Sequence, residues 1–342
     1  MHVAITVDPM LPVPPPLYGG VERIIGLLVR GLVERGHEVT LFAHADSDVP
    51  CRHISFPGTE SQNAFDTMRN TLTLSRLAVE RPDVIHSASR LAYLTPLLPL
   101  KIPKIMNYHR LPSTQQIRKA MVLARDDSLA FTGVSEHIAE QIRPYAPAYA
   151  VYNAVSLDTY DYVGDVSSDG PLAFLGRIEP IKGTHRAIEV AHQTQRELII
   201  AGNVKEEHTT YFQEQVEPHI DGTQIRYIGT VNDAEKNEML GRSAALLMPI
   251  DWEEPFGLVM AEAMACGTPV IGLRRGAVEE VVDHGATGFV CDTVDEMAEA
   301  VGRIGTIDRV ARRERCENLF SQTALVDAYE RVYESRVAVL QS

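Results

Sequence analysis

The chain has 342 residues, of which 45% are hydrophobic, and its formal net charge at pH 7 is −14. This length is enough for two hydrophobic cores. Residues 1–165 carry 15 basic and 17 acidic side chains and the remainder carries 17 and 29, so neither part offers a basic surface to nucleic acid or anionic lipid. We therefore expect no nucleic-acid partner.

The four cysteines are far apart and form no C-x-x-C pair, which argues against a disulfide framework or a zinc site. Residues 1–10 alternate like a strand, and no apolar run approaches the roughly 18 residues of a membrane span. These features predict a cytoplasmic enzyme with reduced thiols, no transmembrane segment and no structural metal.

Strand-like apolar runs alternate with helical stretches along the chain, which indicates β-α-β units and parallel sheets. A first helix is expected over 21–34, and a last helix over 323–340 has no strand after it. Asp, Ser and Gly cluster over 158–170 and mark a linker between two domains. The expected strands cover 3–7, 39–43, 83–86, 104–108 and 129–133, then 172–175, 198–201, 225–228, 244–249 and 269–272.

Candidate functional residues follow these strands. In open parallel sheets, ligands bind beyond the carboxyl ends of the strands, so a site is expected in a cleft between two such domains. The residues at these positions are Gly19, Gly20, His109, Gly176, Arg177, Gly202 and Gly276.

The segment 251–262 places two carboxylates on either side of a Pro-Phe-Gly turn that opens a helix. Gly257 allows a ligand to approach the backbone, and the free amides of Leu258 and Val259 can face an anion. Glu254 precedes the helix and Glu262 lies one turn inside it. Carboxylates at both ends of an anion cradle suggest a sugar nucleotide, because its hydroxyls need acceptors at both ends.

These residues also have structural interpretations. Arg177 and Lys182 converge on phosphate oxygens in the functional interpretation and form a solvated pair in the structural one. Glu254 can cap a helix and Glu262 can be a solvated helical residue, while His109 at a strand end can serve packing alone. The two glycines after the first strand can form a simple tight turn.

Three consecutive residues, Ser135, Glu136 and His137, superficially look like a catalytic trio. Adjacent residues on a helix point in different directions, so we do not expect them to act together.

Taken in order, these features resemble glycosyltransferase family 4 of the GT-B fold, over nearly the whole chain. The C-terminal match is the longest, since Glu-x7-Glu leads directly into Glu-Ala-Met-Ala-Cys-Gly-Thr-Pro-Val. The matching segments are Tyr18-Gly19-Gly20-Val21-Glu22, Gly36-His37-Glu38-Val39, Pro82-Asp83-Val84-Ile85-His86, Phe131-Thr132-Gly133-Val134-Ser135, Tyr152-Asn153-Ala154-Val155, Phe174-Leu175-Gly176-Arg177 with Lys182-Gly183, and Glu254-Pro255-Phe256-Gly257 through Ala265-Cys266-Gly267-Thr268-Pro269-Val270.

The resemblance implies an α/β protein with two Rossmann-like parallel-sheet domains facing a central cleft. An acceptor-side domain is expected over 1–160 and a nucleotide-sugar-binding domain over 165–322, with a helix over 323–342 packing back on the first domain. The implied enzyme is a retaining hexosyltransferase that needs no cofactor and no metal. Front-face substitution at the anomeric carbon is favoured over double displacement with Glu254 as nucleophile.

The resemblance also implies roles for individual residues. Arg177 and Lys182 would hold the diphosphate and offset charge on the leaving group. Glu262 would accept from the ribose hydroxyls and Glu254 from the transferred sugar, while His109 would face the sugar from the acceptor side. The remaining donor-binding residues would be Gly19, Gly20, Gly176, Gly202, Phe256, Gly257, Leu258 and Val259.

Two segments depart from the family pattern or lack a match. Where the family often has Gly-Gly-x-Pro-Glu, the chain has Gly276-Ala277-Val278-Glu279-Glu280, which puts the rigidity of this loop in question but keeps the acidic position. The loop after His109 carries a basic cluster with two interpretations, an anionic acceptor site or solvated helix residues. Its members are Arg110, Arg118, Lys119 and Arg125.

Two other functions share this architecture, a sugar-nucleotide 2-epimerase and an inactive sugar-nucleotide-binding protein. For a transferase, UDP-glucose is the first expected donor, followed by GDP-mannose and other UDP-sugars. The acceptor can be a lipid-linked sugar or a small molecule, and the nearly balanced charge of the first half weakly favours a small molecule over a membrane surface. The sequence leaves the oligomeric state open.

Overall fold

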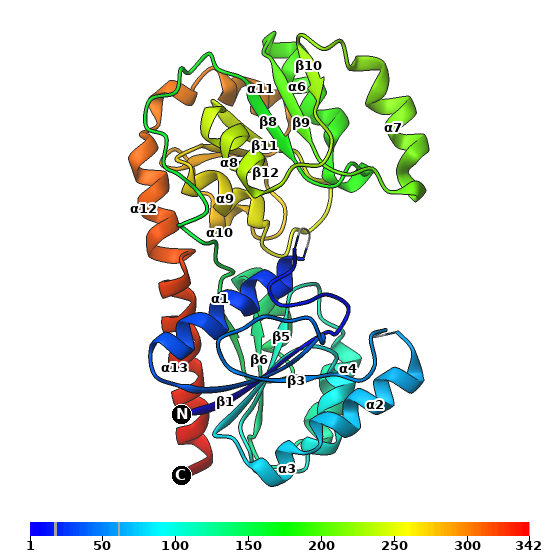
Figure 1. Ribbon diagram of the computed structural model, residues 1–342. Helices are drawn as coiled ribbons and strands as arrows, with labels where there is room; N and C mark the ends of the chain where they lie inside the picture. Colours follow the sequence, from blue (N-terminus) through cyan, green and yellow to red (C-terminus); the bar gives the residue numbers. More distant parts are fainter. Residues whose placement is uncertain (17–18, 61, 342) are drawn as a thin grey trace. The chain divides into compact units, whose positions relative to one another are not determined.

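The computed structural model describes residues 1–16, 19–60 and 62–341. Tyr18, part of the expected glycine motif, lies outside the described residues. The chain forms two compact units, one of Met1–Ala154 with Gln322–Ser342 and one of Val155–Ser321 (Figure 1). The first segment of the first unit thus ends at Ala154, and the Asp-, Ser- and Gly-rich segment belongs to the second unit.

The first unit is built on a seven-stranded parallel sheet in the order β3-β2-β1-β4-β5-β6-β7. In its centre Ile5 pairs with Leu41 on one side and with His86 on the other. The central strands are buried along nearly their whole length, as expected for a parallel sheet with both faces covered. The strands are β1 (His2–Val7), β2 (Glu38–Ala43), β3 (Arg52–Ser55), β4 (Val84–Ala88), β5 (Lys104–Tyr108), β6 (Leu129–Gly133) and β7 (Ala148–Ala150).

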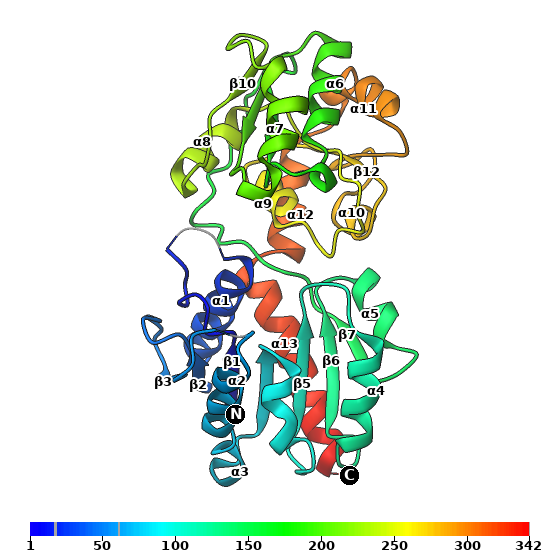
Figure 2. The ribbon, with the colours of Figure 1, turned by 90° about the vertical axis from the view of Figure 1, so that its right-hand side faces the viewer.

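The last helix of the chain packs on this first unit. Figure 2 shows it running along the sheet beside β5 and β6. Tyr333 Oη lies 2.7 Å from His86 Nδ1, and Asn107 donates to the hydroxyl of Tyr329, so the helix bonds to β4 and β5. The helices of this unit are α1 (Gly20–Glu34), α2 (Ala64–Leu74), α3 (Leu77–Glu80), α4 (Thr114–Leu123), α5 (Glu136–Ile142) and α13 (Gln322–Gln341), with a 3₁₀ segment η1 (Leu91–Leu97).

The second unit is built on a six-stranded parallel sheet in the order β10-β9-β8-β11-β12-β13. Leu246 pairs with Ala173 on one side and with Val270 on the other. Buried side chains of this sheet, among them Leu172 and Phe289, form one core with α6 and α11. The strands are β8 (Leu172–Leu175), β9 (Leu198–Ala201), β10 (Ile225–Tyr227), β11 (Ala245–Met248), β12 (Val270–Leu273) and β13 (Gly288–Cys291).

Helices cover this second sheet. In α8 the side chain of Asn232 accepts from the amide of Glu235 while Glu235 bonds back to the amide of Asn232, a capping box that fixes where the helix begins. The helices are α6 (Thr184–Thr194), α7 (Thr209–Gln215), α8 (Asp233–Arg242), α9 (Leu258–Ala265), α10 (Val278–Val281), α11 (Val294–Val301) and α12 (Arg309–Leu319), with 3₁₀ segments η2 (Pro180–Lys182), η3 (Glu206–His208), η4 (Glu217–His219) and η5 (Ile304–Thr306).

The strand order reverses once in each sheet, between β1 and β4 in the first unit and between β8 and β11 in the second. Connections leave to opposite sides at such a point, and the crevice beyond the carboxyl ends of these strands is where ligands bind in this kind of sheet. Each unit thus has its own expected binding position. Among the described residues, no helix is both long and apolar enough to cross a membrane.

Candidate functional sites

Lys182 and Glu254 form a close ion pair in the second unit, with 2.6 Å between Nζ and Oε2. Only 16% and 8% of their side chains are exposed. The backbone next to Lys182 explains the contact. Gly183 has φ +73°, and a Cβ there would lie 2.0 Å from the carbonyl oxygen of Pro249. A glycine therefore lets the turn after β8 lie directly against the end of β11.

Trp252 contacts both members of this ion pair. Its Nε1 donates to Oε2 of Glu254 at 2.9 Å, and the ammonium of Lys182 lies 4.6 Å from the centre of the indole ring. Within the described chain, Lys182 and Trp252 both donate to Oε2 of Glu254. Oε1 is thus the oxygen through which Glu254 can accept a bond from a ligand.

Helix α9 begins directly after this pair. Gly257 has φ +78° and precedes Leu258, and within the described chain no side chain caps the helix start. The first amides, those of Leu258 and Val259, therefore remain for an anion, and the helix dipole adds partial positive charge there. The side chain of Phe256 is 2% exposed and packs edge-on against Phe320, so this side chain is not available to a ligand.

Glu262 is buried and ion-paired, so its interpretation as a solvated helical residue is wrong. It is 8% exposed, its Oε1 lies 2.6 Å from Lys236 Nζ, and the hydroxyl of Tyr160 donates to the same oxygen at 2.8 Å. Sequence reasoning missed both partners. Tyr160 lies in the connection between the units' sheets and Lys236 on a polar helix, and neither position carries a motif.

Arg177 and Lys182 do not share a partner. Arg177 Nη2 lies 2.8 Å from Oε1 of Glu179, a carboxylate that is 3% exposed, and His208 Nε2 lies 3.2 Å from the other oxygen of Glu179. The two predicted phosphate ligands are therefore each held by their own carboxylate.

Gly176 and Gly202 lie against each other at the ends of β8 and β9. Gly202 has φ +152°, and a Cβ on it would lie 1.7 Å from the carbonyl oxygen of Gly176. This close backbone approach alone accounts for a glycine at 202. A direct role of either residue in donor binding stays a prediction.

The loop that departs from the family pattern is fixed by backbone contacts. The amide of Gly276 donates to Glu253 Oε2 at 2.7 Å, and the amide of Ala277 donates to the carbonyl of Glu254 at 2.8 Å. Glu279, which stands where the family often has proline, forms an ion pair with Arg274. These bonds attach the loop to the segment between β11 and α9 that carries Glu254.

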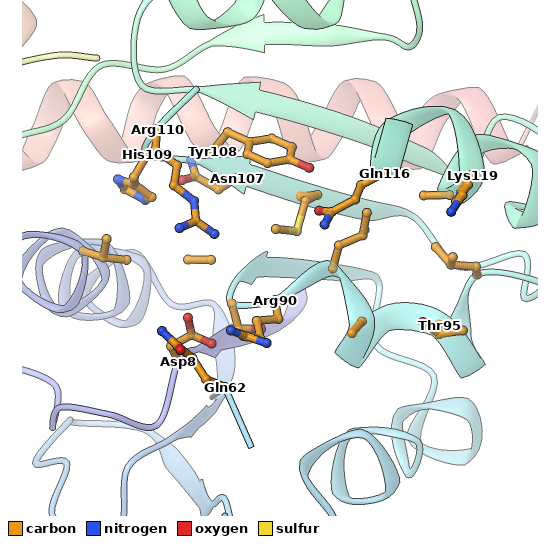
Figure 3. Close-up of a pocket in the computed structure, with 18 of the residues that line it drawn as sticks. Asp8, Gln62, Arg90, Thr95, Asn107, Tyr108, His109, Arg110, Gln116 and Lys119 are labelled. Atoms are coloured by element: carbon orange, nitrogen blue, oxygen red, sulfur yellow. The ribbon is translucent and has the colours of Figure 1, made fainter. Parts of the chain in front are cut away.

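The first unit has a cavity of about 720 Å³ at its own topological switch point (Figure 3). Asp8 directly follows β1, Arg90 follows β4 and His109 follows β5, and all three line it. Sequence reasoning found His109 and missed Asp8 and Arg90, although the same rule about strand ends applies to Asp8. Tyr108 and Asn107 from β5 also line the cavity.

Burial controls protonation in this cavity. It lowers the pKa of His109 to about 4, so the imidazole is neutral at pH 7. Burial raises the pKa of Asp8, while the positive charges of Arg90 and Arg110 oppose that shift. These two guanidinium groups therefore act electrostatically on the carboxylate of Asp8.

Gly19 and Gly20 lie at the start of α1. Gly19 has φ +154°, and a Cβ there would lie 2.8 Å from Pro15 and 2.9 Å from Oε2 of Glu22. Because glycine has no Cβ, Pro15 can lie close to the start of the helix. Gly20 is the first residue of α1, and the next residue, Val21, lines the cavity.

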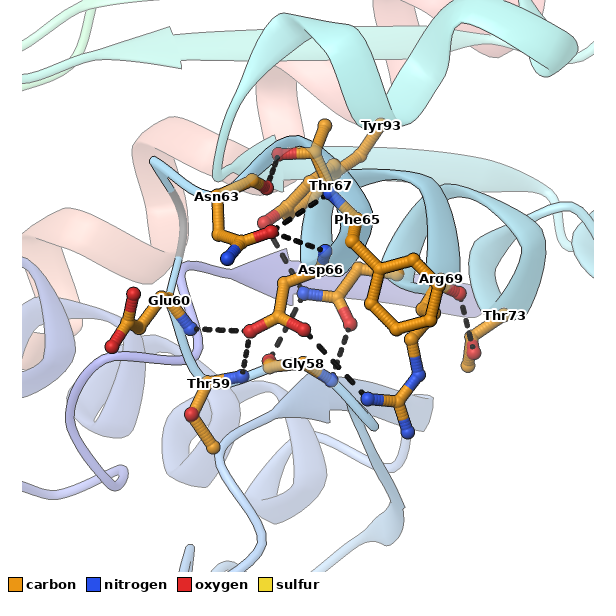
Figure 4. A network of polar contacts seen from close by, with 11 residues as sticks. Gly58, Thr59, Glu60, Asn63, Phe65, Asp66, Thr67, Arg69, Thr73 and Tyr93 are labelled. Carbon is orange, nitrogen blue, oxygen red and sulfur yellow. Dashed lines mark hydrogen bonds and ion pairs between the residues drawn. The ribbon is translucent and has the colours of Figure 1, made fainter.

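A polar network surrounds the start of α2 (Figure 4). Asn63 accepts from the amides of Phe65 and Asp66 and caps the helix. Asp66 Oδ2 accepts from the amides of Thr59 and Glu60, both at 3.1 Å. Gln62, the residue before Asn63, lines the cavity.

The basic cluster after His109 divides in the structure. Arg110 and Lys119 line the cavity. Arg118 instead lies over the ring of Tyr145, at 4.6 Å from its centre, and Arg125 lies 3.7 Å from Asp126. Two members of the cluster thus line the cavity and two do not, and binding of an anionic acceptor stays a prediction.

Ser135 has a structural role. Its hydroxyl accepts from the amide of Ile138 at 3.2 Å and caps α5. The three consecutive residues 135–137 therefore begin a helix, as their order in the sequence suggests.

Comparison with known proteins agrees with these features. The profile "Glycosyltransferase Family 4" matches residues 18–159, and the profile "Glycosyl transferases group 1" matches residues 167–318. A glycogen synthase of Mycobacterium tuberculosis is 25% identical over 88% of this chain and 86% of its own length.

Solved structures show the same fold. AviGT4, a glycosyltransferase involved in avilamycin A biosynthesis, superimposes with a TM-score of 0.74 and 23% identity, over 98% of each chain. Anabaena HepE in complex with UDP and glucose gives a TM-score of 0.73 and 17% identity, over 98% of this chain and all of the other. The chain thus belongs to glycosyltransferase family 4 and is an enzyme of the GT-B fold.

Proposed function

We propose that the protein is a retaining hexosyltransferase that moves a sugar from a nucleotide-sugar donor, UDP-glucose as the first candidate, to the hydroxyl of an acceptor. The donor binds to the second unit and the acceptor to the first. The observation that supports this proposal is the arrangement at the start of α9, which no described side chain caps. Glu254, paired with Lys182, lies shortly before this helix, and Glu262 lies one turn inside it. HepE, which has the same fold, is known in complex with UDP and with glucose.

The donor's diphosphate suits the start of α9. Two backbone amides, the helix dipole and the ammonium of Lys182 all favour negative charge there. Lys182 remains paired with Glu254 while it contacts a phosphate, because an ammonium has three donors. Arg177, whose side chain is 30% exposed, can direct the N–H groups not facing Glu179 to the same diphosphate.

The sugar and the ribose fit the two carboxylates. Glu254 Oε1 accepts from a hydroxyl of the transferred hexose. Glu262 accepts from the ribose hydroxyls, with its charge held in place by Lys236 and Tyr160. Both carboxylates are more than nine-tenths buried, so bonds made to them are well shielded from water.

The chemical step is front-face substitution. The bond between the anomeric carbon and the phosphate oxygen breaks, and its electron pair stays on the phosphate. The acceptor oxygen forms its bond to the same face of the anomeric carbon, and its proton passes to the departing phosphate oxygen. The protein's part is to stabilise the growing charge, so no metal is needed; losing one such contact typically costs about 3–4 kcal/mol in the transition state.

Incubation of the protein with UDP-glucose or UDP-N-acetylglucosamine without acceptor tests the reaction class. We expect slow release of UDP in the presence of EDTA, which chromatography of the reaction mixture measures. Appearance of a C2-epimerised nucleotide sugar would show an epimerase instead. Activity that is lost in EDTA and restored by Mg²⁺ or Mn²⁺ would contradict the metal-independent step.

Replacing Lys182 by Ala tests its role. We expect the rate of UDP release to fall by about 100- to 1000-fold, from the lost charge on the leaving group. Lys182→Arg keeps the positive charge beside Glu254 and should retain part of the rate. The matched control is Lys205→Ala, because Lys205 is 46% exposed and lies 3.6 Å from Glu207 on the surface. Equal rates in Lys182→Ala and Lys205→Ala would remove Lys182 from the mechanism.

A further inference from the structure

Three cations and one carboxylate surround the cavity of the first unit. Arg90 comes from the end of β4, Arg110 from the loop after β5 and Lys119 from α4, and Asp8 is the one acidic residue among the described residues that line it (Figure 3). The whole chain carries a net charge of −14. A positively charged cavity in so acidic a protein indicates an anionic ligand.

Among the described residues, none of these three cations is held in an ion pair, although Arg90 and Arg110 act electrostatically on Asp8. In the ranges that the structure describes, no side-chain hydrogen bond or ion pair joins Arg90, Arg110 or Lys119 to another residue. The neighbouring arginines differ, since Arg118 stacks on a tyrosine ring and Arg125 pairs with an aspartate. The cations that line the cavity therefore differ from these arginines, because their side chains form no ion pair or ring contact within the described ranges.

Buried polar atoms line the same cavity. Asn107 and Tyr108 are 4% and 7% exposed, and within the described chain Oδ1 of Asn107 and the hydroxyl of Tyr108 have no hydrogen-bond partner. The same holds for Oδ1 of Asp8 and Nε2 of His109. Polar atoms buried without partners are unfavourable, so a ligand with hydroxyl groups that bonds to them is stabilised.

We propose that the acceptor is a small hydroxylated anion. Its carboxylate or phosphate binds to Arg90, Arg110 and Lys119. One of its hydroxyls donates to Asp8 and lies against the neutral imidazole of His109. This assignment rests on the transferase function proposed above, since it names the class of molecule that receives the sugar.

The chemistry of the cavity suits such a molecule. A guanidinium offers two parallel donors that match the oxygens of a carboxylate or a phosphate, and the ammonium adds a point charge. A volume of about 720 Å³ accommodates a ligand of the size of a monosaccharide with an acidic group. In the transfer, the acceptor hydroxyl oxygen forms the glycosidic bond, and its proton leaves with the phosphate oxygen of the donor.

Glucose, glucuronate and glucose 6-phosphate form a matched set of probes, because they share hydroxyl groups and differ in charge. We expect the two anions to bind to the full-length protein at least ten times more tightly than glucose in isothermal titration calorimetry. We also expect this preference to shrink as NaCl is raised, since charge screening weakens the contacts. Equal affinity for the three probes would overturn the proposal.

Two variants locate the site. Arg110→Gln and Lys119→Gln change exposed side chains and should each weaken binding of the better anionic probe about tenfold, at an unchanged melting temperature. The matched control is Arg118→Gln, one residue before Lys119 on α4 and directed to Tyr145, which should bind as the wild type does. Anion binding that is equally strong in all three variants would place the anion elsewhere and overturn the proposal.

A phosphate can also belong to a lipid headgroup, and a third measurement separates the two sources. We expect no co-sedimentation with vesicles of phosphatidylcholine and phosphatidylglycerol. Co-sedimentation that is lost in Arg110→Gln would assign the site to a lipid and overturn the small-molecule assignment. A wild-type protein that binds UDP-glucose but prefers no anion contradicts only this assignment, whereas one that neither binds nor cleaves nucleotide sugars contradicts the proposed function itself.

Discussion

Lys236 Nζ lies 2.6 Å from Oε1 of Glu262, and this ion pair joins α8 to α9. The side chains of the two residues are 12% and 10% exposed. Lys236 also lies 3.3 Å from Asp233 and 5.2 Å from the centre of the Tyr160 ring. The carboxylate proposed to bind the ribose is thus positioned by a second helix and by the connection that precedes β8.

Replacement of Lys236 by Ala leaves Glu262 buried without its cation. We expect the free energy of unfolding to fall by about 3 kcal/mol, because removing one partner of a buried pair strands the other charge. The KM for the donor should rise, since Glu262 loses its fixed position. Urea unfolding and initial rates measure the two effects. Arg242→Ala is the control on the same helix. Arg242 pairs with Glu238 at the surface, where the two side chains are 77% and 60% exposed, and its loss should cost less than about 1 kcal/mol.

Trp252 should report donor binding by its fluorescence. It is the single tryptophan of the chain, and it contacts both Glu254 and Lys182. Titration with UDP-glucose is expected to change the emission in a saturable way, because the ligand alters the charge next to the indole. Trp252→Phe should abolish the signal while sugar transfer remains measurable. Saturable turnover in the wild type with constant emission would mean that the donor binds away from this ion pair.

Gly202→Ala should destabilise the second unit strongly. The added Cβ would lie 1.7 Å from a backbone oxygen, so β8 and β9 must separate at their ends, which we expect to cost more than about 2 kcal/mol. Gly222 provides a control, since it also has a positive φ, +73°, but has no atom within 4 Å of an added Cβ. Gly222→Ala should cost about 1 kcal/mol, from backbone strain alone. Thermal unfolding compares the two, and equal losses would refute the packing argument.

The histidine at the centre of the first sheet makes the stability of that unit pH-dependent. Burial, and to a smaller extent the charge of His109, lowers the pKa of His86 to about 3. The unfolded chain therefore binds a proton that the folded chain does not, and stability is lost as the pH falls from about 6.5 towards 3. Between pH 7 and 5 this group alone is expected to remove about 2 kcal/mol from the free energy of unfolding.

His86→Leu should flatten that pH dependence in urea unfolding at pH 7 and pH 5. Tyr333→Phe is the matched control, because it removes the partner 2.7 Å from Nδ1 and leaves the imidazole in place. It should lower stability at both pH values and keep the slope. A slope that is unchanged in His86→Leu would assign the pH dependence to other groups.

Most of the fold followed from apolar periodicity, but three strands were not predicted. One of them, β13 (Gly288–Cys291), was missed although it is apolar and fully buried. The central strands are continuous apolar runs, as buried parallel strands must be. By contrast, β3 (Arg52–Ser55) contains an arginine and a histidine and is only partly buried, and β7 (Ala148–Ala150) has three half-buried residues. Both lie at the edges of the first sheet, where one side of the strand has no neighbour. Edge strands of this kind need little hydrophobicity, so their pattern is weak.

The candidate sites were predicted only where a residue follows a strand or belongs to a motif. Arg177, Lys182 and Glu254 were found in this way. Lys236 and Tyr160 were not, because what makes them important is the carboxylate they contact, and contacts between distant segments leave no local pattern. For the same reason the basic cluster after His109 could not be divided from the sequence into residues that line the cavity and residues that do not.

Helix α13 (Gln322–Gln341) gives the first unit a particular folding order. Tyr333 meets His86 across 247 positions of sequence, and the whole second unit lies between them. On the ribosome the second unit is therefore synthesised completely before the earlier sheet receives its last covering helix. Until then the polar groups of His86 and Asn107 lack their tyrosine partners. The first unit thus stays incomplete until α13 has been made, although its sheet is translated first.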